Sequence, residues 1–333
     1  LKTFGIQQTV DEKSAISQAE SGLKQLSSGF IQMPLIWRLR DGKRPHIPDN
    51  FPMVLQRQLA QERKLSKTPE LLEAFNNNFK CEIDDGYIRA ATEQDMLTVG
   101  NINYVPMSLV VNANKRPIKT RNVYDASAKF KGTSLNDNLL AGPNLLIDLL
   151  KPVMSMRENL IAFTGDIKSM FNRILIDPID QNCQRLLWRE DTSQAMQIFV
   201  KKSMLFGPSS SPFMSQFAKN WIADKFKDIY PTTSECIKKE VYMDDLFTSA
   251  PTLEEAISRA KEAIEIFASA QMQLTSIQSN SSELLAALPE ERIKKELIPL
   301  LSDSNIDYVS KVLGVNWNTS TDKIVFELNE SLL

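Results

Sequence analysis

Two adjacent carboxylates, Asp244 and Asp245, stand in the run Tyr242-Met243-Asp244-Asp245. Apolar residues typical of strands precede and follow the run, which predicts a tight hairpin turn carried by buried strands. Neighbouring carboxylates on a rigid turn repel each other unless a cation lies beside them. Mg²⁺ prefers one or two carboxylates together with water and phosphate oxygens. The run therefore predicts a metal-binding turn, although a solvated surface turn could contain the same four residues.

Asp166 supplies a third carboxylate, because it ends another short apolar run at 160–165. If the two strands neighbour each other in one sheet, Asp166, Asp244 and Asp245 meet at one edge. Two divalent ions about 4 Å apart could then share Asp166 and Asp244. One ion would activate an attacking hydroxyl and the other would hold a triphosphate, as in-line phosphoryl transfer requires. The expected cofactor is a pair of Mg²⁺ ions, with Mn²⁺ as an alternative.

A second acidic pair, Asp84-Asp85, follows a helical pattern that starts at Thr68-Pro69. Gly86 comes next and suits the C-terminal cap of that helix. We therefore interpret Asp84-Asp85 as a solvated helix end without a catalytic role.

Composition excludes several other kinds of site. The one histidine, His46, leaves few zinc ligands and no second histidine for a Ser-His-Asp or Cys-His mechanism. The sequence has no GxGxxG and no GxxxxGK[ST] loop, so phosphates would be held by Arg, Lys and carboxylate-bound metal. The three cysteines form no CxxC pair and are expected to be buried or semi-buried thiols in a reducing compartment.

The net charge of −2 is low for a nucleic-acid binder, but an acidic metal site makes local charge more informative than the total. No apolar run approaches the roughly 20 residues of a membrane span, and there is no signal peptide. We expect an intracellular, cytoplasmic protein that is neither secreted nor bound to a membrane. Because residue 1 is Leu1, we also expect a piece of a longer product.

The remaining pattern alternates helices with mainly antiparallel strands, without regular βαβ units, which predicts an α+β fold. Residues 1–98 are expected to be helical and connecting. Strands are expected at 104–111, 121–125, 160–166, 185–189 and 197–200, a helical stretch at 167–174, a long helix at 208–230 and a last hairpin at 312–326.

The hairpin expected around 104–125 is strongly basic from its turn onward. Six Lys or Arg residues and a single acid, Asp125, occur between 115 and 131. Such a hairpin is either a solvated face or a surface that closes over a triphosphate or a template backbone.

Nine sequence blocks resemble, in the same order, those of the reverse transcriptases of BEL/Pao-type long-terminal-repeat retrotransposons. They are RNVYDASAK at 121–129, SLNDNL at 134–139, GP at 142–143, GDI at 165–167, QRLLWR at 184–189, FGP at 206–208, SPF at 211–213, YMDDL at 242–246 and KVLG at 311–314. Residues 50–98 match more loosely the family's segment between protease and polymerase. The resemblance implies an RNA-directed DNA polymerase that binds an RNA or DNA template with its primer and dNTPs.

The resemblance also implies a right-hand polymerase fold of fingers and palm, with a mainly antiparallel palm sheet flanked by helices. The linker would span 1–98, the fingers 99–158 and the palm 159–333. The palm segment would take in part of the fingers near 175–205 and end in a primer-grip hairpin. The thumb would be absent or truncated. Protease, RNase H and integrase would belong to the same polyprotein, in the setting of a virus-like particle.

Individual roles follow from the same resemblance. Asp166, Asp244 and Asp245 match the catalytic, metal-binding carboxylates. Arg121 matches the fingers arginine on the triphosphate, and Lys115 the lysine on the γ-phosphate. Phe171 matches the bulky gate beneath the sugar that rejects a 2′-hydroxyl. The other matches are Ile167, Phe206 and Gly207 at the nucleotide and Leu313 and Gly314 at the primer grip.

One position departs from the family. Its members commonly carry a Lys-Trp pair where this chain has Ser276-Ile277. A lysine there could protonate the leaving pyrophosphate, so its absence favours a second hypothesis, a weakened or domesticated nucleic-acid-binding palm. A third hypothesis is an RNA-dependent RNA polymerase or a palm-type cyclase. Phe171 argues against ribonucleotide use, and no GGDEF-like run occurs.

Overall fold

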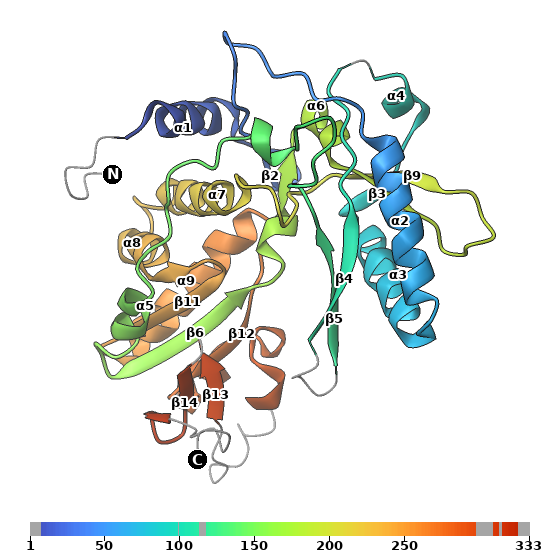
Figure 1. The fold of residues 1–333 in the computed structure, drawn as a ribbon. Coiled ribbons are helices and arrows are strands. Elements are labelled where there is room, and N and C mark those ends of the chain that lie inside the picture. The colour runs from blue at the N-terminus through green and yellow to red at the C-terminus, as the bar shows by residue number, and fades with distance from the viewer. Residues whose placement is uncertain (1–7, 99, 113–117, 298–308, 313–314, 326–333) are drawn as a thin grey trace, which may run out of the picture. The chain divides into compact units, whose positions relative to one another are not determined.

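The computed structural model describes residues 8–98, 100–112, 118–297, 309–312 and 315–325 (Figure 1). Helices mix with small sheets, and every named strand pair is antiparallel except β2 (Ile31–Met33) with β7 (Ile174–Ile176). This mixture is compatible with the predicted α+β class. Within the described ranges, no helix is both long and apolar enough to cross a membrane.

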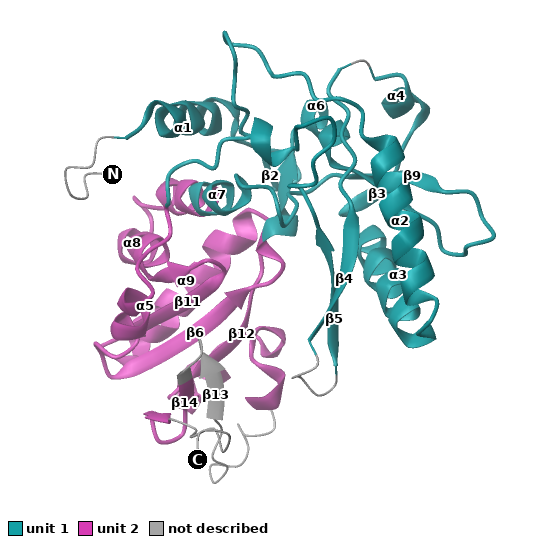
Figure 2. Ribbon diagram, viewed as in Figure 1, with its two compact units in different colours: residues 1–144, 171–217 teal, residues 145–170, 218–333 magenta. Residues whose placement is uncertain are grey.

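The chain divides into two compact units (Figure 2). The first contains residues 1–144 and 171–217, and the second contains residues 145–170 and 218–333. These boundaries differ from the segment boundaries expected near 98 and 158. Helix α7 (Ser211–Lys225) begins in the first unit and ends in the second.

The first unit holds two three-stranded sheets, β1-β2-β7 and β3-β9-β8, and the hairpin β4-β5. Helix α3 packs along strand β5 (Figure 1). Besides β2, β7 and the start of α7, its elements are α1 (Val10–Gly22), β1 (Lys24–Gln25), α2 (Phe51–Leu65), α3 (Pro69–Asp84), β3 (Ile88–Ala90), α4 (Glu93–Met96), β4 (Met107–Asn112), β5 (Lys119–Tyr124), η1 (Asn136–Asn138), η2 (Met170–Arg173, from the last residue of the second unit), α6 (Pro178–Gln181), η3 (Asn182–Gln184), β8 (Arg185–Trp188) and β9 (Gln197–Lys201).

The predicted ends of α3 are confirmed. Pro69 occupies the first turn, where its missing N–H leaves no hydrogen bond unmade. At the other end, Gly86 takes a φ of +74° and its N–H donates to the Ile83 carbonyl. Asp84 and Asp85 are exposed at this helix end, as expected.

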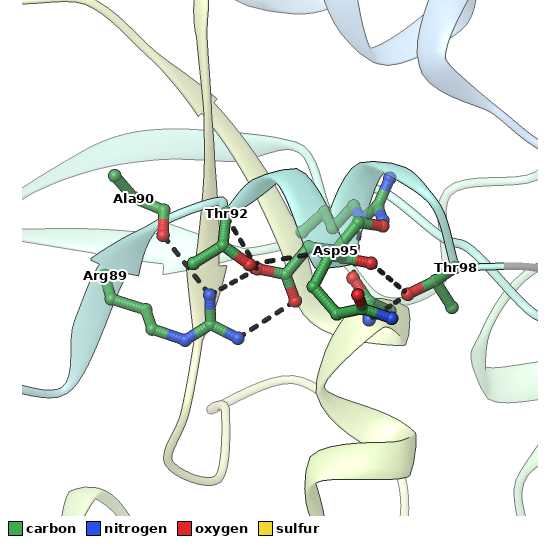
Figure 3. Close-up of polar contacts among 8 residues, drawn as sticks. Arg89, Ala90, Thr92, Asp95 and Thr98 are labelled. Carbon is green, nitrogen blue, oxygen red and sulfur yellow. Dashed lines mark hydrogen bonds and ion pairs between the residues drawn. The ribbon is translucent and has the colours of Figure 1, made fainter.

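A buried polar corner ties α4 to its neighbours (Figure 3). The Asp95 carboxylate, in a residue only 6% exposed, accepts from the Arg89 guanidinium through both oxygens and from the Thr92 N–H at 2.7 Å. The Asp95 carbonyl in turn accepts from the Arg185 guanidinium. These hydrogen bonds, chiefly that of Arg89, hold the pKa of Asp95 well below its usual range.

The second unit is built on a four-stranded antiparallel sheet in the order β10-β11-β6-β12. Helix α9 packs on β6, β11 and β12, while α5 and α8 contact β11 (Figure 1). Besides the end of α7, its elements are α5 (Leu150–Ser155), β6 (Ile161–Ile167), α8 (Pro231–Glu240), β10 (Val241–Tyr242), β11 (Asp245–Ala250), α9 (Leu253–Ser269), β12 (Leu274–Ser279), α10 (Ser282–Ala286), η4 (Glu290–Arg292), β13 (Val309–Val312), β14 (Val315–Asn318) and β15 (Lys323–Val325).

Two predicted helices were wrong in extent. The long helix expected at 208–230 is α7 alone; the chain then turns, and Pro231 opens α8 as a separate helix. The helical stretch expected at 167–174 is the short 3₁₀ turn η2, after which β7 pairs with β2. Apolar residues at 174–176 serve a buried strand as well as a helix, so periodicity alone could not separate the two.

Asp95→Asn should lower the free energy of unfolding by about 2 kcal/mol at pH 7, because charge-assisted hydrogen bonds to a buried carboxylate are lost. The folded-state pKa of Asp95 lies below its unfolded value, so this contribution is complete above about pH 4 and fades as the pH falls further. Urea unfolding at pH 7 and pH 3 measures both effects. Exposed Asp84→Asn is the control, and a loss as large at pH 3 as at pH 7 contradicts the assignment.

Candidate active site

The three predicted carboxylates come together in the second unit. Asp166 of β6 and Asp245 of β11 are register partners in the antiparallel ladder. Because directly opposed residues project from the same face of a sheet, their side chains share that face. Asp244 lies in the adjoining turn, where its carbonyl accepts a 2.8 Å hydrogen bond from the Ile167 N–H.

The turn itself is a two-residue hairpin loop. Tyr242 and Asp245 pair across it, leaving Met243 and Asp244 as the loop. Met243 takes a φ of +56°, as the first loop position of a type II′ turn requires. An L side chain in that conformation costs roughly 1 kcal/mol or more relative to glycine.

Buried side chains hold this strained turn in place. Tyr242 packs against a cluster that includes Phe247 of β11 and fully buried Trp317 of β14. In the preceding residue, Val241, the backbone carbonyl accepts a 3.4 Å hydrogen bond from the ammonium of buried Lys219. The carboxylates therefore stand on a well-anchored hairpin.

The three carboxyl groups have no neutralising partner among the described residues. Burial raises the pKa of all three carboxyl groups. Burial and, secondarily, the charges of Asp244 and Asp166 raise the pKa of Asp245 to about 7. Among the described residues, no Lys or Arg forms an ion pair with any of the three.

Carboxylate oxygens without a cationic partner fit a hard divalent ion such as Mg²⁺ or Mn²⁺. In the side-chain conformations seen here, the described His, Cys, Asp and Glu residues form no group of three around a single point. The fit thus rests on the donor type, the shared sheet face and the uncompensated charge.

Ser276 lies on the other side of β6, in a β-bulge of β12. Thr275 pairs with Asp166 and Gln278 with Thr164, so Ser276 and Ile277 together face Gly165. A Cβ on Gly165 would stand 3.0 Å from a Leu274 methyl carbon, so glycine lets the bulged strand pack tightly. Ser276 is exposed, with a φ of +53°.

The predicted nucleotide-binding aromatic residues stack on each other in the first unit. The ring centroids of Phe171 and Phe206 are 4.3 Å apart, at an interplanar angle of 29°. Phe171 is 6% exposed whereas Phe206 is 50% exposed, so Phe206 forms the open surface of the stack. Next to it, Gly207 takes a φ of +121°, and a Cβ there would stand 2.4 Å from the Tyr124 carbonyl oxygen. Only glycine fits this close approach.

Arg121 lies beside the stack, on β5, and lines the same cavity of about 310 Å³ as Phe206. Glu82, Asn172 and Lys201 also line this cavity. They form a partly buried polar network around Lys201. Sequence reasoning missed it, because no spacing rule joins residues of α3, η2 and β9.

The remaining predicted residues contribute less. Ile167 is fully buried, so its side chain is a core residue and its N–H makes the contact with Asp244. Lys115, Leu313 and Gly314 lie outside the described residues. The cysteines are free thiols; Cys183 and Cys236 are buried as expected, whereas Cys81 is exposed, so the prediction of burial was wrong for Cys81.

In metal-free buffer, Asp245→Asn is expected to raise the free energy of unfolding at pH 8 by about 1 to 3 kcal/mol. The folded-state pKa near 7 exceeds the unfolded value of 3.8, so the wild-type chain loses stability as the pH rises from about 4 to 7. Urea unfolding in EDTA across this range measures the gain. It should be near zero at pH 4, and a gain independent of pH would contradict the electrostatic cause. Asp84→Asn, at an exposed helix end, serves as the control.

Comparison with known proteins adds no family to this geometry: no protein-family profile matches the chain. No curated protein matches its sequence significantly.

Proposed function

We propose that this chain is the fingers-and-palm part of an RNA-directed DNA polymerase, resembling the BEL/Pao retrotransposon enzymes. The observation that carries the proposal is the pairing of Asp166 with Asp245 in one ladder, beside Asp244 in the turn. Three carboxylates at one sheet edge, without a cationic partner among the described residues, suit metal-assisted nucleotidyl transfer. On this proposal the second unit is the palm and the first unit contains the fingers.

The proposed reaction joins a deoxynucleotide to a primer. The primer 3′-oxygen forms a bond to the α-phosphorus and its proton passes to solvent, while the bond to the bridging α–β oxygen breaks and pyrophosphate leaves with the electron pair. Two Mg²⁺ ions, or Mn²⁺, would supply charge neutralisation and activation of the hydroxyl when bound. Asp166, Asp244 and Asp245 would hold them, and the hairpin strands keep these carboxylates aligned.

Nucleotide binding is assigned to the cavity of the first unit. Arg121 is exposed, and its guanidinium suits a triphosphate because it can donate two parallel hydrogen bonds. The exposed ring of Phe206, supported from below by Phe171, offers an apolar surface for the sugar or base. The template–primer, an RNA or DNA strand with its primer, is the other proposed ligand.

The proposal extends to the cellular setting. The chain would belong to a Pol polyprotein with protease, RNase H and integrase, and would act in the cytoplasm within a virus-like particle. Sequencing of the flanking reading frame tests this assignment.

A nucleic-acid-binding palm without turnover is the second candidate. Ser276 favours it, because this exposed hydroxyl cannot replace a lysine as the proton donor to pyrophosphate. The two candidates differ in one measurement, the incorporation of a nucleotide by a chain that binds primer–template.

With Mg²⁺, the 333-residue chain in excess over oligo(dT)-primed poly(rA) should add dTTP. Asp244→Asn should reduce this incorporation at least 100-fold while primer–template binding stays within about threefold, because the carboxylate serves the chemical step. Asp84→Asn, which alters the other acidic pair, should incorporate like the wild type. Binding without incorporation by the wild type would refute the polymerase and support the second candidate.

Phe171→Ala should raise the use of UTP relative to dTTP about tenfold, because the loss of the buried ring leaves Phe206 unsupported beneath the sugar. The ratio of kcat/KM for the two nucleotides is the measurement. The variant should also lose roughly 3 kcal/mol of stability through the cavity. An unchanged ratio would remove the aromatic stack from sugar selection.

A further inference from the structure

A buried lysine lines the cavity beside the aromatic stack in the first unit. Lys201, the last residue of β9, is 1% exposed, and its ammonium donates to the Glu82 carboxylate of α3 and, at 2.8 Å, to the Asn172 side-chain carbonyl. Glu82 also accepts from the Tyr124 hydroxyl at 2.7 Å. The same ammonium lies over the rings of Tyr87 and Tyr124, at 5.5 and 5.7 Å from their centroids.

Stability alone is a weak reason for this arrangement. Removing an ammonium and a carboxylate from water has a large desolvation penalty, and well-packed apolar residues often serve a core as well or better. Burial accordingly lowers the pKa of Lys201, while Glu82 opposes the shift. The ion pair instead fixes orientation, because each of its hydrogen bonds holds one side chain at a set distance and angle from another.

The groups that the network fixes adjoin both rings of the stack. Asn172 directly follows Phe171, and its side-chain carbonyl is also a hydrogen-bond acceptor for Ser203 at 3.3 Å. Tyr124 lies against the loop that carries Phe206, since the Tyr124 carbonyl oxygen occupies the space that a Cβ on Gly207 would need. One ammonium thus connects the residue after Phe171 with the residue that supports the loop of Phe206.

We propose that Lys201 is a positioning residue, whose hydrogen bonds through Asn172 and Glu82 set the spacing and tilt of the Phe171–Phe206 stack and thereby the selection of deoxyribose over ribose. This inference rests on the proposed polymerase function. Lys201 itself does not touch the nucleotide; it acts through the two rings.

The test compares single-nucleotide incorporation of dTTP and UTP by the 333-residue chain and its variants. Lys201→Met and Asn172→Ala should each reduce the preference for dTTP, as the ratio of kcat/KM values, about tenfold. Asn172→Ala keeps the Lys201–Glu82 ion pair, so it tests the Lys201–Asn172 hydrogen bond even if Lys201→Met does not fold. Because both variants break the Lys201–Asn172 hydrogen bond, the double variant should show about the same tenfold change as either single variant, not a hundredfold one.

A matched control removes another ion pair of the same unit. Arg189 pairs with Glu62, with side chains 16% and 7% exposed, and neither residue lines the stack's cavity. Arg189→Met should lower the urea midpoint but leave the nucleotide preference within twofold of wild type. Equal losses with both nucleotides in Asn172→Ala, or an equal change of preference in Arg189→Met, would overturn the inference. Failure of the wild type to incorporate either nucleotide would instead refute the proposed polymerase and the inference with it.

Discussion

The antiparallel pairing of β6 with β11 is the interaction on which the candidate site depends. Six register pairs run from Asp245–Asp166 to Ala250–Ile161, and they place carboxyl groups from distant parts of the chain on one sheet face. Burial of nearly all the other ladder residues resists a slip of register, because a one-residue shift would move every side chain to the opposite face of the sheet and disrupt its packing there. The energy of core packing thereby keeps mutually repelling carboxylates together.

In the first unit, buried cations with several hydrogen-bond partners join separate elements. Arg185, 2% exposed, donates to the Asn182 side chain, the Tyr104 hydroxyl and the Asp95 carbonyl. Lys201 is satisfied by a carboxylate and an amide. Such networks are favourable only when every member has its partners, so they specify one arrangement of the loops they join. Because the first unit consists of small sheets and many connecting segments, such polar contacts help to hold its loops in one arrangement.

The sequence predicted best those features that neighbouring residues encode. The β10–β11 hairpin and the strand ending at Asp166 follow from local apolar runs, and Pro69 and Gly86 mark the ends of α3. Pairing of β6 with β11 was a conditional expectation, since a run of apolar residues does not name its partner. The Lys201 network was beyond reach, because its members are separated by up to 119 residues and become neighbours only through tertiary packing. The helix expected at 208–230 ends five residues early, at Lys225, because an apolar pattern does not mark a helix end as a proline or glycine does.

Two of the seven described non-glycine residues with positive φ lie beside the carboxylates. Met243 precedes Asp244 in the hairpin loop, and Ser276 follows Thr275, the register partner of Asp166, in the bulge of β12. Both are non-glycine residues with φ near +55°. Glycine would adopt either conformation at a lower energy, so backbone energetics do not explain why Met243 and Ser276 occupy these positions. The β10–β11 turn adjoins Asp245, and the β12 bulge begins directly after Thr275, the partner of Asp166, so both irregularities border the carboxylates. The irregular backbone is therefore best understood as part of the construction of the carboxylate site.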